Sequence, residues 1–360
     1  MDERISSKLR RNTEVRSISN VCEPPRAAPG GPAFPSEEIL AALDLGTNNC
    51  RLLIVRRQEG GWKTVGSHSE IVRLGEGLST SGVLSEAAMK RALSALDVCA
   101  AKIGARRADR VRAVATQACR AAANGADFLA RVERETGLKL EIITPAEEAR
   151  LAVQGCLELA DPLAEAVLVL DIGGGSTELS WVSPGRPGSE SPIVAWLSAP
   201  LGVVSLAERC PEPLGGGEAW RSAMRAEFRR EMEAFKGAAS LRAAFLAGRA
   251  HLIGTSGAIT SLAALHLDLR RYQRSQVDGL WMTSPQWRAA AARVADMSPD
   301  ERAKSPCIGK GRADLVLAGA AILEAVQELW PTERVRVADR GLREGMLLEM
   351  MGAESSWTSR

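Results

Sequence analysis

Two short acidic turns, both rich in glycine, contain the residue types that phosphate chemistry requires. The segment DIGGGST (171–177) follows an apolar run and places Asp171 two residues before the first of three consecutive glycines. Glycines let backbone N–H groups converge without crowding from Cβ atoms, and such a nest binds anions such as phosphate. A carboxylate at the end of the preceding strand could hold Mg²⁺, which favours one or two carboxylates plus phosphate oxygens.

The same pattern occurs earlier in the chain as DLGT (44–47). One such turn alone could equally be a plain glycine hairpin with an exposed aspartate. Setting Asp44 on Asp171 also aligns the apolar runs on both sides of each turn. The recurrence therefore favours two related lobes whose turns face each other across a cleft and bind phosphate.

A pair of glutamates opens a predicted helix. Thr144 followed by Pro145 is typical of a helix start, and Glu147 at the third helical position fits a capping box. Glu148 lies off the polar stripe that Glu147 begins, on a semi-apolar side of the helix. A carboxylate there is unexpected unless something uses it. The alternative is a boundary residue whose carboxylate reaches water.

Composition excludes several classes of protein. The 360 residues are 45% hydrophobic and 25% charged, as in an ordinary globular protein. A net charge of +2 does not fit a globally basic nucleic-acid binder, so we expect no nucleic-acid partner. Three histidines exclude a His-rich metal centre and disfavour a His-based triad. The sequence also contains no P-loop, no dinucleotide-binding fingerprint and no nucleophile elbow.

The seven cysteines are odd in number and never form C-x-x-C, which indicates reduced thiols in a reducing compartment. No run of about 18 apolar residues is present, so we expect no membrane partner. The N-terminus has charges of both signs and no apolar core of a secretory signal. We therefore expect a cytoplasmic protein.

The chain divides into a tail and two lobes. Residues 1–38 are rich in Pro and Gly and are expected to be a disordered tail. A first lobe is predicted over 39–161 and a second over 162–352. Each opens with a strand, an acidic turn and a second strand, at 39–57 and 166–182.

Helices and strands alternate through both lobes, which indicates an α/β fold. Further strands are predicted at 111–116, 140–143, 193–198 and 334–339, with a strand, turn and helix over 250–265. Helices are predicted near 84–103, 125–135, 144–159, 220–235, 284–297 and 312–329. A last helix, at 341–352, is expected to pack back on the first lobe.

Six segments resemble one family in both order and spacing. They are AALDLGTNNCRLLIV, ATQACRAAANGADFL, EEARLA, LDIGGGSTEL, GTSGAITSLA and ADRGLREGML. Together they resemble the exopolyphosphatase / guanosine pentaphosphate phosphohydrolase (Ppx/GppA) family, in its short two-domain form. The resemblance implies two actin-like (ribonuclease H-like) lobes with a central cleft, and a phosphoanhydride hydrolase.

The resemblance also implies roles for particular residues. Glu148, the second Glu of EEAR, would be the catalytic base that activates water, and Arg120 matches an active-site arginine. The metal set, for Mg²⁺, would be Asp44, Asp171 and Glu178. The phosphate-binding set would be Gly46, Thr47, Asn48, Gly173, Gly174, Gly175, Ser176 and Thr177.

Smaller signals lie in the second lobe. Thr255 and Ser256 stand where a strand meets a helix, which suits an anion site, although Ser256 could equally be a simple helix cap. Lys310, Arg312 and Arg274 could guide a polyanion or form a solvated face.

Two positions depart from the family pattern. The family often has Glu after the arginine of ATS-x-x-R, where this chain has Ala121. It often has Arg after Leu-Gly-x-Val, where this chain has Ser205. Both departures affect the expected substrate contacts and leave the chemistry of Glu148 unaffected.

Several functions therefore remain open. The first is a Mg²⁺-dependent exopolyphosphatase that acts on inorganic polyphosphate, with guanosine pentaphosphate as the alternative substrate. A kinase or ATPase of the same superfamily is a second hypothesis, and a non-catalytic polyphosphate or alarmone sensor is a third. A homodimer is expected by family analogy.

Overall fold

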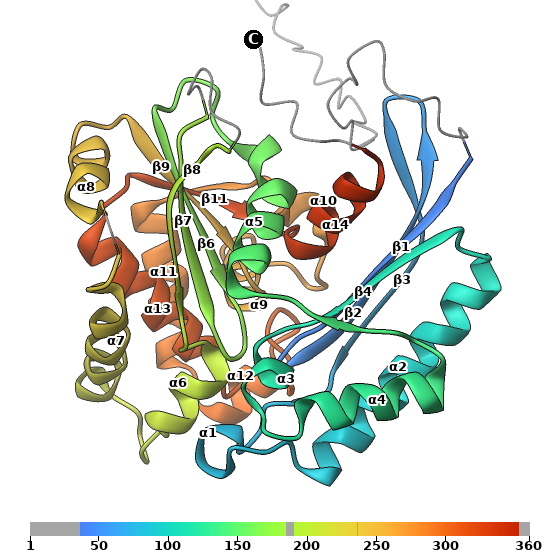
Figure 1. The fold of residues 1–360 in the computed structure, drawn as a ribbon. Coiled ribbons are helices and arrows are strands. Elements are labelled where there is room, and N and C mark those ends of the chain that lie inside the picture. Colours follow the sequence, from blue (N-terminus) through green and yellow to red (C-terminus); the bar gives the residue numbers. More distant parts are fainter. Residues whose placement is uncertain (1–36, 185–190, 236, 353–360) are drawn as a thin grey trace, which may run out of the picture.

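The computed structural model describes residues 37–184, 191–235 and 237–352. Figure 1 shows two β-sheets with helices packed around them, one in each half of the chain. The predicted tail, 1–38, lies almost entirely outside the described residues. Its last residue, Glu38, borders the first strand and pairs with Arg110.

The first sheet has the order β3-β2-β1-β4-β5. β1 runs antiparallel to β2 and parallel to β4. The strands are β1 (Ile39–Leu45), β2 (Asn49–Gln58), β3 (Gly61–Ile71), β4 (Arg110–Ala115) and β5 (Glu141–Ile142). Its helices are α1 (Leu78–Ser81), α2 (Glu86–Arg106), α3 (Gln117–Ala121) and α4 (Gly125–Thr136).

The second sheet has the order β10-β11-β9-β6-β7-β8. The strands are β6 (Ala166–Ile172), β7 (Thr177–Val182), β8 (Ile193–Ala199), β9 (Ala250–Thr255), β10 (Trp281–Thr283) and β11 (Arg334–Ala338). The helices that follow β8 are α6 (Val203–Arg209), α7 (Glu218–Met232), α8 (Ala238–Leu246), α9 (Gly257–His266), α10 (Arg274–Val277), α11 (Ser284–Asp296), α12 (Pro299–Lys304) and α13 (Val316–Leu329).

The two sheets share one connectivity. In each, three antiparallel strands follow one another, and later strands lie on the other side of the first strand: β4 and β5 in the first sheet, and β9, β11 and β10 in the second. β6 therefore corresponds to β1 and β7 to β2, which confirms the alignment of Asp44 with Asp171. We call the two halves the first and second lobe, while the boundary at 161/162 stays a prediction.

Two helices lie between the lobes: α5 (Pro145–Cys156), continued by the 3₁₀ turn Leu157–Leu159, and α14 (Leu342–Met350). α5 contributes Leu151 to a cluster with the first sheet and Val153 to a cluster with the second. α14 follows the second sheet in sequence, yet Met346 packs on strands of the first.

α5 and α14 cross at backbone contact distance. A Cβ atom on Gly345 would lie 2.1 Å from the carbonyl oxygen of Leu151, and one on Gly155 would lie 2.0 Å from that of Gly341. No side chain fits at either position without moving a helix. The glycines therefore set how closely the interlobe helices approach.

Some elements differ from the sequence prediction. β3, α8 and β10 were not predicted; β3 is an edge strand with no fully buried side chain, so it lacks an apolar signal. The helix predicted from residue 312 begins only at Val316, because the preceding residues form turns, such as Arg312 N–H to the Gly309 carbonyl.

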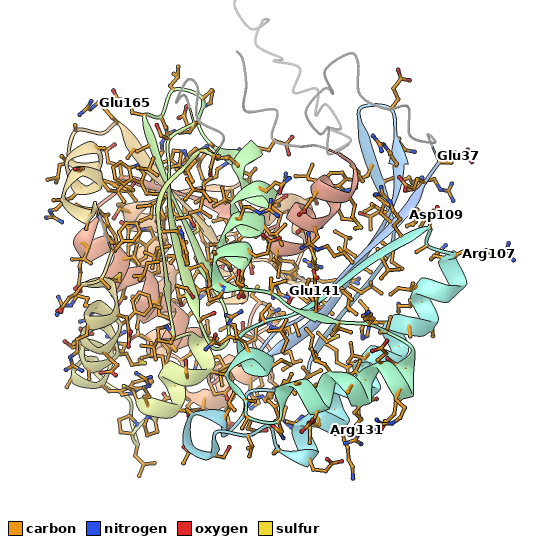
Figure 2. The ribbon with its side chains drawn as sticks, in the orientation of Figure 1. Glu37, Arg107, Asp109, Arg131, Glu141 and Glu165 are labelled. Atoms are coloured by element: carbon orange, nitrogen blue, oxygen red, sulfur yellow. The ribbon has the colours of Figure 1, made fainter. Side chains whose placement is uncertain are left out.

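Charged side chains such as Arg131, Glu141 and Glu165 lie at the outside of the molecule (Figure 2). Arg131 on α4, for example, pairs with Glu86 and Glu135. No disulfide joins the cysteines of the described ranges. A helix long and apolar enough to cross a membrane is likewise absent from that part of the chain.

Replacing Gly345 with Ala should destabilise the protein, because the new methyl group collides with a backbone oxygen. We expect a loss of about 1–3 kcal/mol in the free energy of unfolding, measured by urea denaturation. Gly104→Ala is the matched control: Gly104 lies in α2 with open space around it. It should gain roughly 0.5–1 kcal/mol, and equal effects of the two changes would contradict the close approach.

Candidate active site

The turns of the two acidic hairpins touch each other. Each turn is closed by a backbone hydrogen bond of 2.9 Å, from Gly46 to Asn49 and from Gly173 to Ser176. A Cβ atom on Gly174 would lie only 3.0 Å from the backbone nitrogen of Asn48. The predicted meeting of the turns across the lobes is therefore present in the structure.

The glycine turn is held from behind by the start of α6. The N–H groups of Val203 and Val204 donate to the carbonyls of Gly173 and Gly174, at 3.0 and 2.8 Å. In a trans peptide the C=O and the N–H point in opposite directions. The N–H groups of Gly174 and Gly175 therefore point away from α6, as an anion-binding nest requires.

A cavity of about 780 Å³ lies in front of the turns, and both lobes line it. We call it the main cavity. The predicted residues that line it are Asp44, Gly46, Thr47, Asn48, Glu148, Asp171, Gly173, Gly174, Gly175, Ser176, Glu178, Thr255 and Ser256. Most of the predicted set is thus brought to one place.

Glu148 stands in the first turn of α5, where it is only 8% exposed and faces the main cavity. Its Oε2 accepts hydrogen bonds from both terminal nitrogens of Arg120, each at 3.1 Å. Burial raises the pKa of Glu148 to about 7, against the lowering effect of Arg120; the nearby carboxylates of Asp171 and Asp44 raise it further. The carboxyl is thus poised to exchange a proton near neutral pH.

The neighbouring Glu147 has a structural role, as expected, but its carboxylate bonds to arginines and not to the backbone N–H of Thr144. Thr144 caps the helix, since its hydroxyl accepts from Glu147 N–H at 3.2 Å. The predicted capping box is wrong, because the Glu147 carboxylate bonds instead to Arg150 at 2.8 Å and Arg112 at 3.0 Å. Two arginines compete better for a carboxylate than one backbone N–H.

The two hairpins carry different partners opposite their aspartates. The strand register sets Asp44 against Arg51 in the first hairpin and Asp171 against Glu178 in the second. Directly opposed residues share one face of a sheet. The second hairpin therefore presents two acids side by side, and the first presents an acid and a base.

Burial is the main influence on these acids. It raises the pKa of Asp171 to about 7 and also raises that of Asp44, where Arg51 opposes the effect. Burial raises the pKa of Glu178 well above its usual value, and Glu148 and Asp171 raise it further. The cavity thus concentrates carboxylates whose negative charge is not fully compensated.

Several oxygens of the first turn lack a hydrogen-bond partner within the described ranges. They are Asp44 Oδ1, Thr47 Oγ1, Asn48 Oδ1 and Asn49 Oδ1, all buried. Hard oxygen donors of this kind suit Mg²⁺. The residues therefore fit the predicted ion.

The predicted metal set of Asp44, Asp171 and Glu178 stays a prediction, and all three residues line the main cavity. Among the residues described, no three His, Cys, Asp or Glu side chains lie close enough together to form a ready metal cluster. Glu178 is 2% exposed, and its Oε1 accepts a hydrogen bond from Ser198 at 2.7 Å. One of its carboxylate oxygens is therefore engaged on the neighbouring strand.

Three of the predicted phosphate contacts have structural partners. The Thr177 hydroxyl donates to the Leu201 carbonyl at 2.8 Å, and its side chain is fully buried and does not line the cavity. Ser256 caps α9 by accepting from two backbone N–H groups, which agrees with the simpler interpretation. Thr255 donates to the Arg340 carbonyl at 2.9 Å.

Cations also line the main cavity. Arg312 and Arg274, which were predicted to guide a polyanion, are among them, while Arg51 and Arg343 were missed. Burial lowers the pKa of Arg343, and Glu344 opposes this. Arg51 could have been found from its spacing, because it mirrors Asp44 across the turn.

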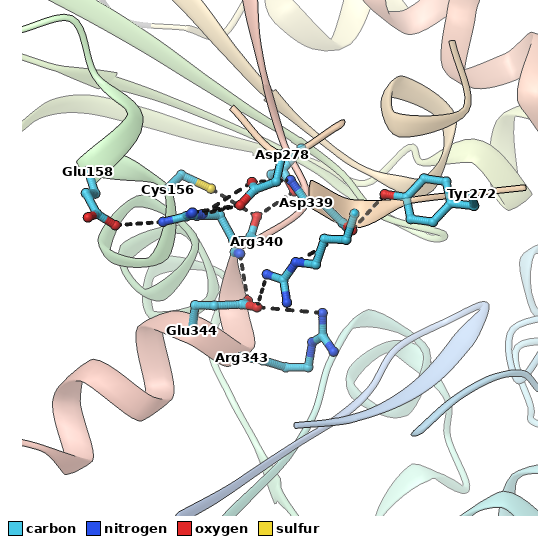
Figure 3. A network of polar contacts seen from close by, with 11 residues as sticks. Cys156, Glu158, Tyr272, Asp278, Asp339, Arg340, Arg343 and Glu344 are labelled. Atoms are coloured by element: carbon cyan, nitrogen blue, oxygen red, sulfur yellow. Dashed lines mark hydrogen bonds and ion pairs between the residues drawn. The ribbon is translucent and has the colours of Figure 1, made fainter. Parts of the chain in front are cut away.

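A buried polar network anchors part of the cavity wall (Figure 3). Arg340 lies just before α14. Its guanidinium is 2.7 Å from Glu158, in the 3₁₀ turn after α5, and 2.7 Å from Asp278, at the end of α10. Glu344 accepts from Arg274 at 2.8 Å. Burial alone would raise the pKa of Glu344, but Arg343 and Arg274 hold it below its usual value. The network thus fixes positive charge beside the acids.

The model of the Ppx/GppA phosphatase family matches residues 53–354. The chain belongs to this family, as the sequence motifs indicated, and is a phosphoanhydride hydrolase with an actin-like fold.

Particular relatives agree with this membership. Exopolyphosphatase 2 of Mycobacterium tuberculosis is 30% identical over 328 residues, which span 87% of this chain and 98% of the relative. Exopolyphosphatase 1 of Mycobacterium leprae is 31% identical, over 89% and 91%. An exopolyphosphatase structure from Cytophaga hutchinsonii superposes with a TM-score of 0.77 at 25% identity, covering 89% of this chain and all of that one. The Aquifex aeolicus family member gives 0.69 at 28%, covering 88% and 99%.

Asp171→Asn should stabilise the unliganded protein above pH 5. The folded-state pKa of about 7 lies above the ordinary aspartate value of 3.8, so stability from this group is complete below 3.8 and is lost as the pH rises towards 7. Asparagine does not titrate, and at pH 8 we expect a gain on the order of 2–4 kcal/mol in the free energy of unfolding.

Urea denaturation from pH 4 to 8 measures this difference. The exposed Asp97→Asn on α2 is the control and should change stability by less than about 0.5 kcal/mol at every pH. A pH-independent effect of Asp171→Asn would contradict the burial of a charged group.

Proposed function

We propose that this protein is a Mg²⁺-dependent exopolyphosphatase, which releases terminal orthophosphate from inorganic polyphosphate with Glu148 as general base. The observation that carries the proposal is the buried Glu148 carboxyl, which faces one cavity together with both acidic turns. The names of its relatives support the choice of substrate.

The residues divide the reaction between them. A water molecule attacks the terminal phosphorus and gives a proton to Glu148, while the bridging P–O bond breaks and the shortened chain keeps its oxygen. The hydrogen bonds from Arg120 hold the Glu148 carboxylate in place. The N–H groups of Gly174 and Gly175 suit the negative charge on the phosphate oxygens, which preorganised donors stabilise best.

Mg²⁺ would be held by Asp44 and Asp171, with the unpartnered oxygens of Thr47 and Asn48 nearby. Once bound, the ion would neutralise phosphate charge and orient the chain. The Asp44 carboxylate raises the pKa of Asp171, and both aspartates raise the pKa of Glu148. A bound cation would relieve this repulsion.

Guanosine pentaphosphate remains the alternative substrate, since its terminal anhydride needs the same chemistry. Parallel phosphate-release assays with long-chain polyphosphate and guanosine pentaphosphate distinguish the two. Tight Mg²⁺-dependent binding without release from either would instead favour a sensor. The homodimer and the cytoplasmic location also stay predictions.

Glu148→Gln should lower kcat by about 10²–10⁴-fold while substrate binding persists, because the amide cannot accept the proton. Steady-state phosphate release gives kcat, and titration of the inactive variant with polyphosphate gives the affinity. Glu147→Gln is the matched control, since Glu147 pairs with Arg112 and Arg150. It should retain nearly full kcat; a wild-type rate in Glu148→Gln would overturn the assignment.

The rate should also report the titration of the base. Only the ionised carboxylate accepts a proton, and the pKa of Glu148 in the metal-free protein is about 7. A cation held by Asp44 and Asp171 would cancel their raising effect, so at saturating Mg²⁺ and substrate the pKa of Glu148 should be lower. Below that lowered pKa, kcat should fall roughly tenfold for each pH unit, and above it kcat should level off. A pH–rate profile from 4.5 to 9 measures this. The residual activity of Glu148→Gln should lack this limb, and a wild-type profile without an acidic limb would contradict the role of Glu148.

A further inference from the structure

A second cavity of about 370 Å³ adjoins the main cavity, at the size of a small-ligand site. We call it the rear cavity. Its walls come from the loop around α1 and from α3 in the first lobe, and from α6 in the second. The lining residues are Thr47, Gly75, Leu78, Ser79, Thr80, Gln117, Ala118, Ala121, Gly175, Pro200, Val204, Ser205, Glu208 and Arg209.

The two cavities share a thin wall. Thr47 and Gly175 line both of them. A Cβ atom on Gly175 would lie 2.7 Å from Thr47 Oγ1 and 3.0 Å from Gln117 Cγ, so these three residues close the passage. Thr47 is 6% exposed, and its hydroxyl has no hydrogen-bond partner within the described ranges.

The wall is connected to the catalytic pair. Gln117 Oε1 accepts a hydrogen bond from Arg120 at 2.8 Å, and Arg120 holds Glu148. The glycine nest forms the other side of the wall through Gly175. A phosphate cleaved beside Glu148 would therefore lie next to this wall.

The rear cavity has a polar lining of mixed charge. Arg209 supplies a positive charge, and it also pairs with Glu227 at 3.1 Å and Glu231 at 3.8 Å. The Thr80 hydroxyl and the Gln117 amide can offer hydrogen bonds to a small anion, while the Ser205 hydroxyl already accepts from Gly202 N–H at 2.8 Å. Its one carboxylate, Glu208, accepts hydrogen bonds from Gly77 N–H and the Ser79 hydroxyl, which use its oxygens.

Two small residues, Ala121 and Ser205, line the rear cavity on its α3 and α6 sides. Their short side chains leave space behind the glycine turn, and a large side chain at either position would fill it.

We propose that the rear cavity takes up the orthophosphate product and lets it leave while the shortened polyphosphate stays in the main cavity. This inference rests on the proposed exopolyphosphatase function. A chain that remains bound fills the space in front of the glycine turn, so the product cannot leave that way until the chain moves. A route through Thr47, Gln117 and Gly175 removes that conflict and permits successive cleavages.

Ala121→Phe tests the proposal, because the exposed Ala121 can accept a ring that fills the rear cavity. Thr80→Phe fills it from another wall. Ala123→Phe is the matched control, since Ala123 is exposed and lines neither cavity. Rapid quench measures phosphate formed, and a fluorescent phosphate-binding protein measures phosphate released, with long-chain polyphosphate and with tripolyphosphate.

With long chains, both plugged variants should show a burst of formed phosphate, about tenfold slower release, and accumulation of intermediate chain lengths. With tripolyphosphate, the short remainder leaves readily, so turnover should stay within about twofold of wild type. The control should match wild type on both substrates.

Equal losses on both substrates without a burst, or release unchanged in both variants, would overturn the exit route. If the wild-type protein released no phosphate from either substrate, the proposed function would fail, and the exit route with it. The outcomes that overturn the exit route come from the variants and leave phosphate release by the wild-type protein intact. Failure of the exit route is therefore distinguishable from failure of the proposed function.

Discussion

The contact between two hairpin turns is the constraint on which the site depends. Gly174 and Gly175 approach Thr47 and Asn48 so closely that a methyl group on either glycine would strike the opposite turn. Each turn alone could bind an anion weakly with a few N–H groups. Held together, the two turns form one surface with Asp44 and Asp171 at its sides. This surface is also the wall that separates the main cavity from the rear cavity.

Burying several carboxylates beside these turns is electrostatically unfavourable, and nearby arginines offset part of this effect. Burial raises the pKa values of Asp44, Asp171 and Glu148, which means that an unliganded protein resists ionising them. Arg120 and the buried Arg343 supply compensating charge without neutralising the acids completely. The remaining negative charge is available to bind a cation. Until a cation binds, these buried carboxylates lower the free energy of unfolding, so the site gains its function at a cost in stability.

The interlobe helices connect this chemistry to the fold. α5 packs on both sheets and carries Glu148 in its first turn, so any shift between the lobes moves the base relative to the turns. The glycine crossing with α14 limits such shifts, and α14 itself carries Arg343. The crossing helices thus position the base and Arg343, while Asp44 and Asp171 stand on the strands β1 and β6.

The local sequence determined the two hairpins, the N-cap of α5 at Thr144 and the position of Glu148 on the semi-apolar side of that helix. Turn residues, helix caps and helix periodicity act within a few residues, so the sequence alone reveals them. Family motifs added Arg120 as an active-site arginine. Tertiary structure alone decided that Arg120 pairs with Glu148, that Thr177 bonds to the Leu201 carbonyl and Glu178 to Ser198 on β8, and that Arg51 and Arg343 join the site. It also decided that Ala121 and Ser205 share one cavity. These depend on strand register and lobe packing, which bring together residues far apart in the chain and leave no periodic signal in the sequence.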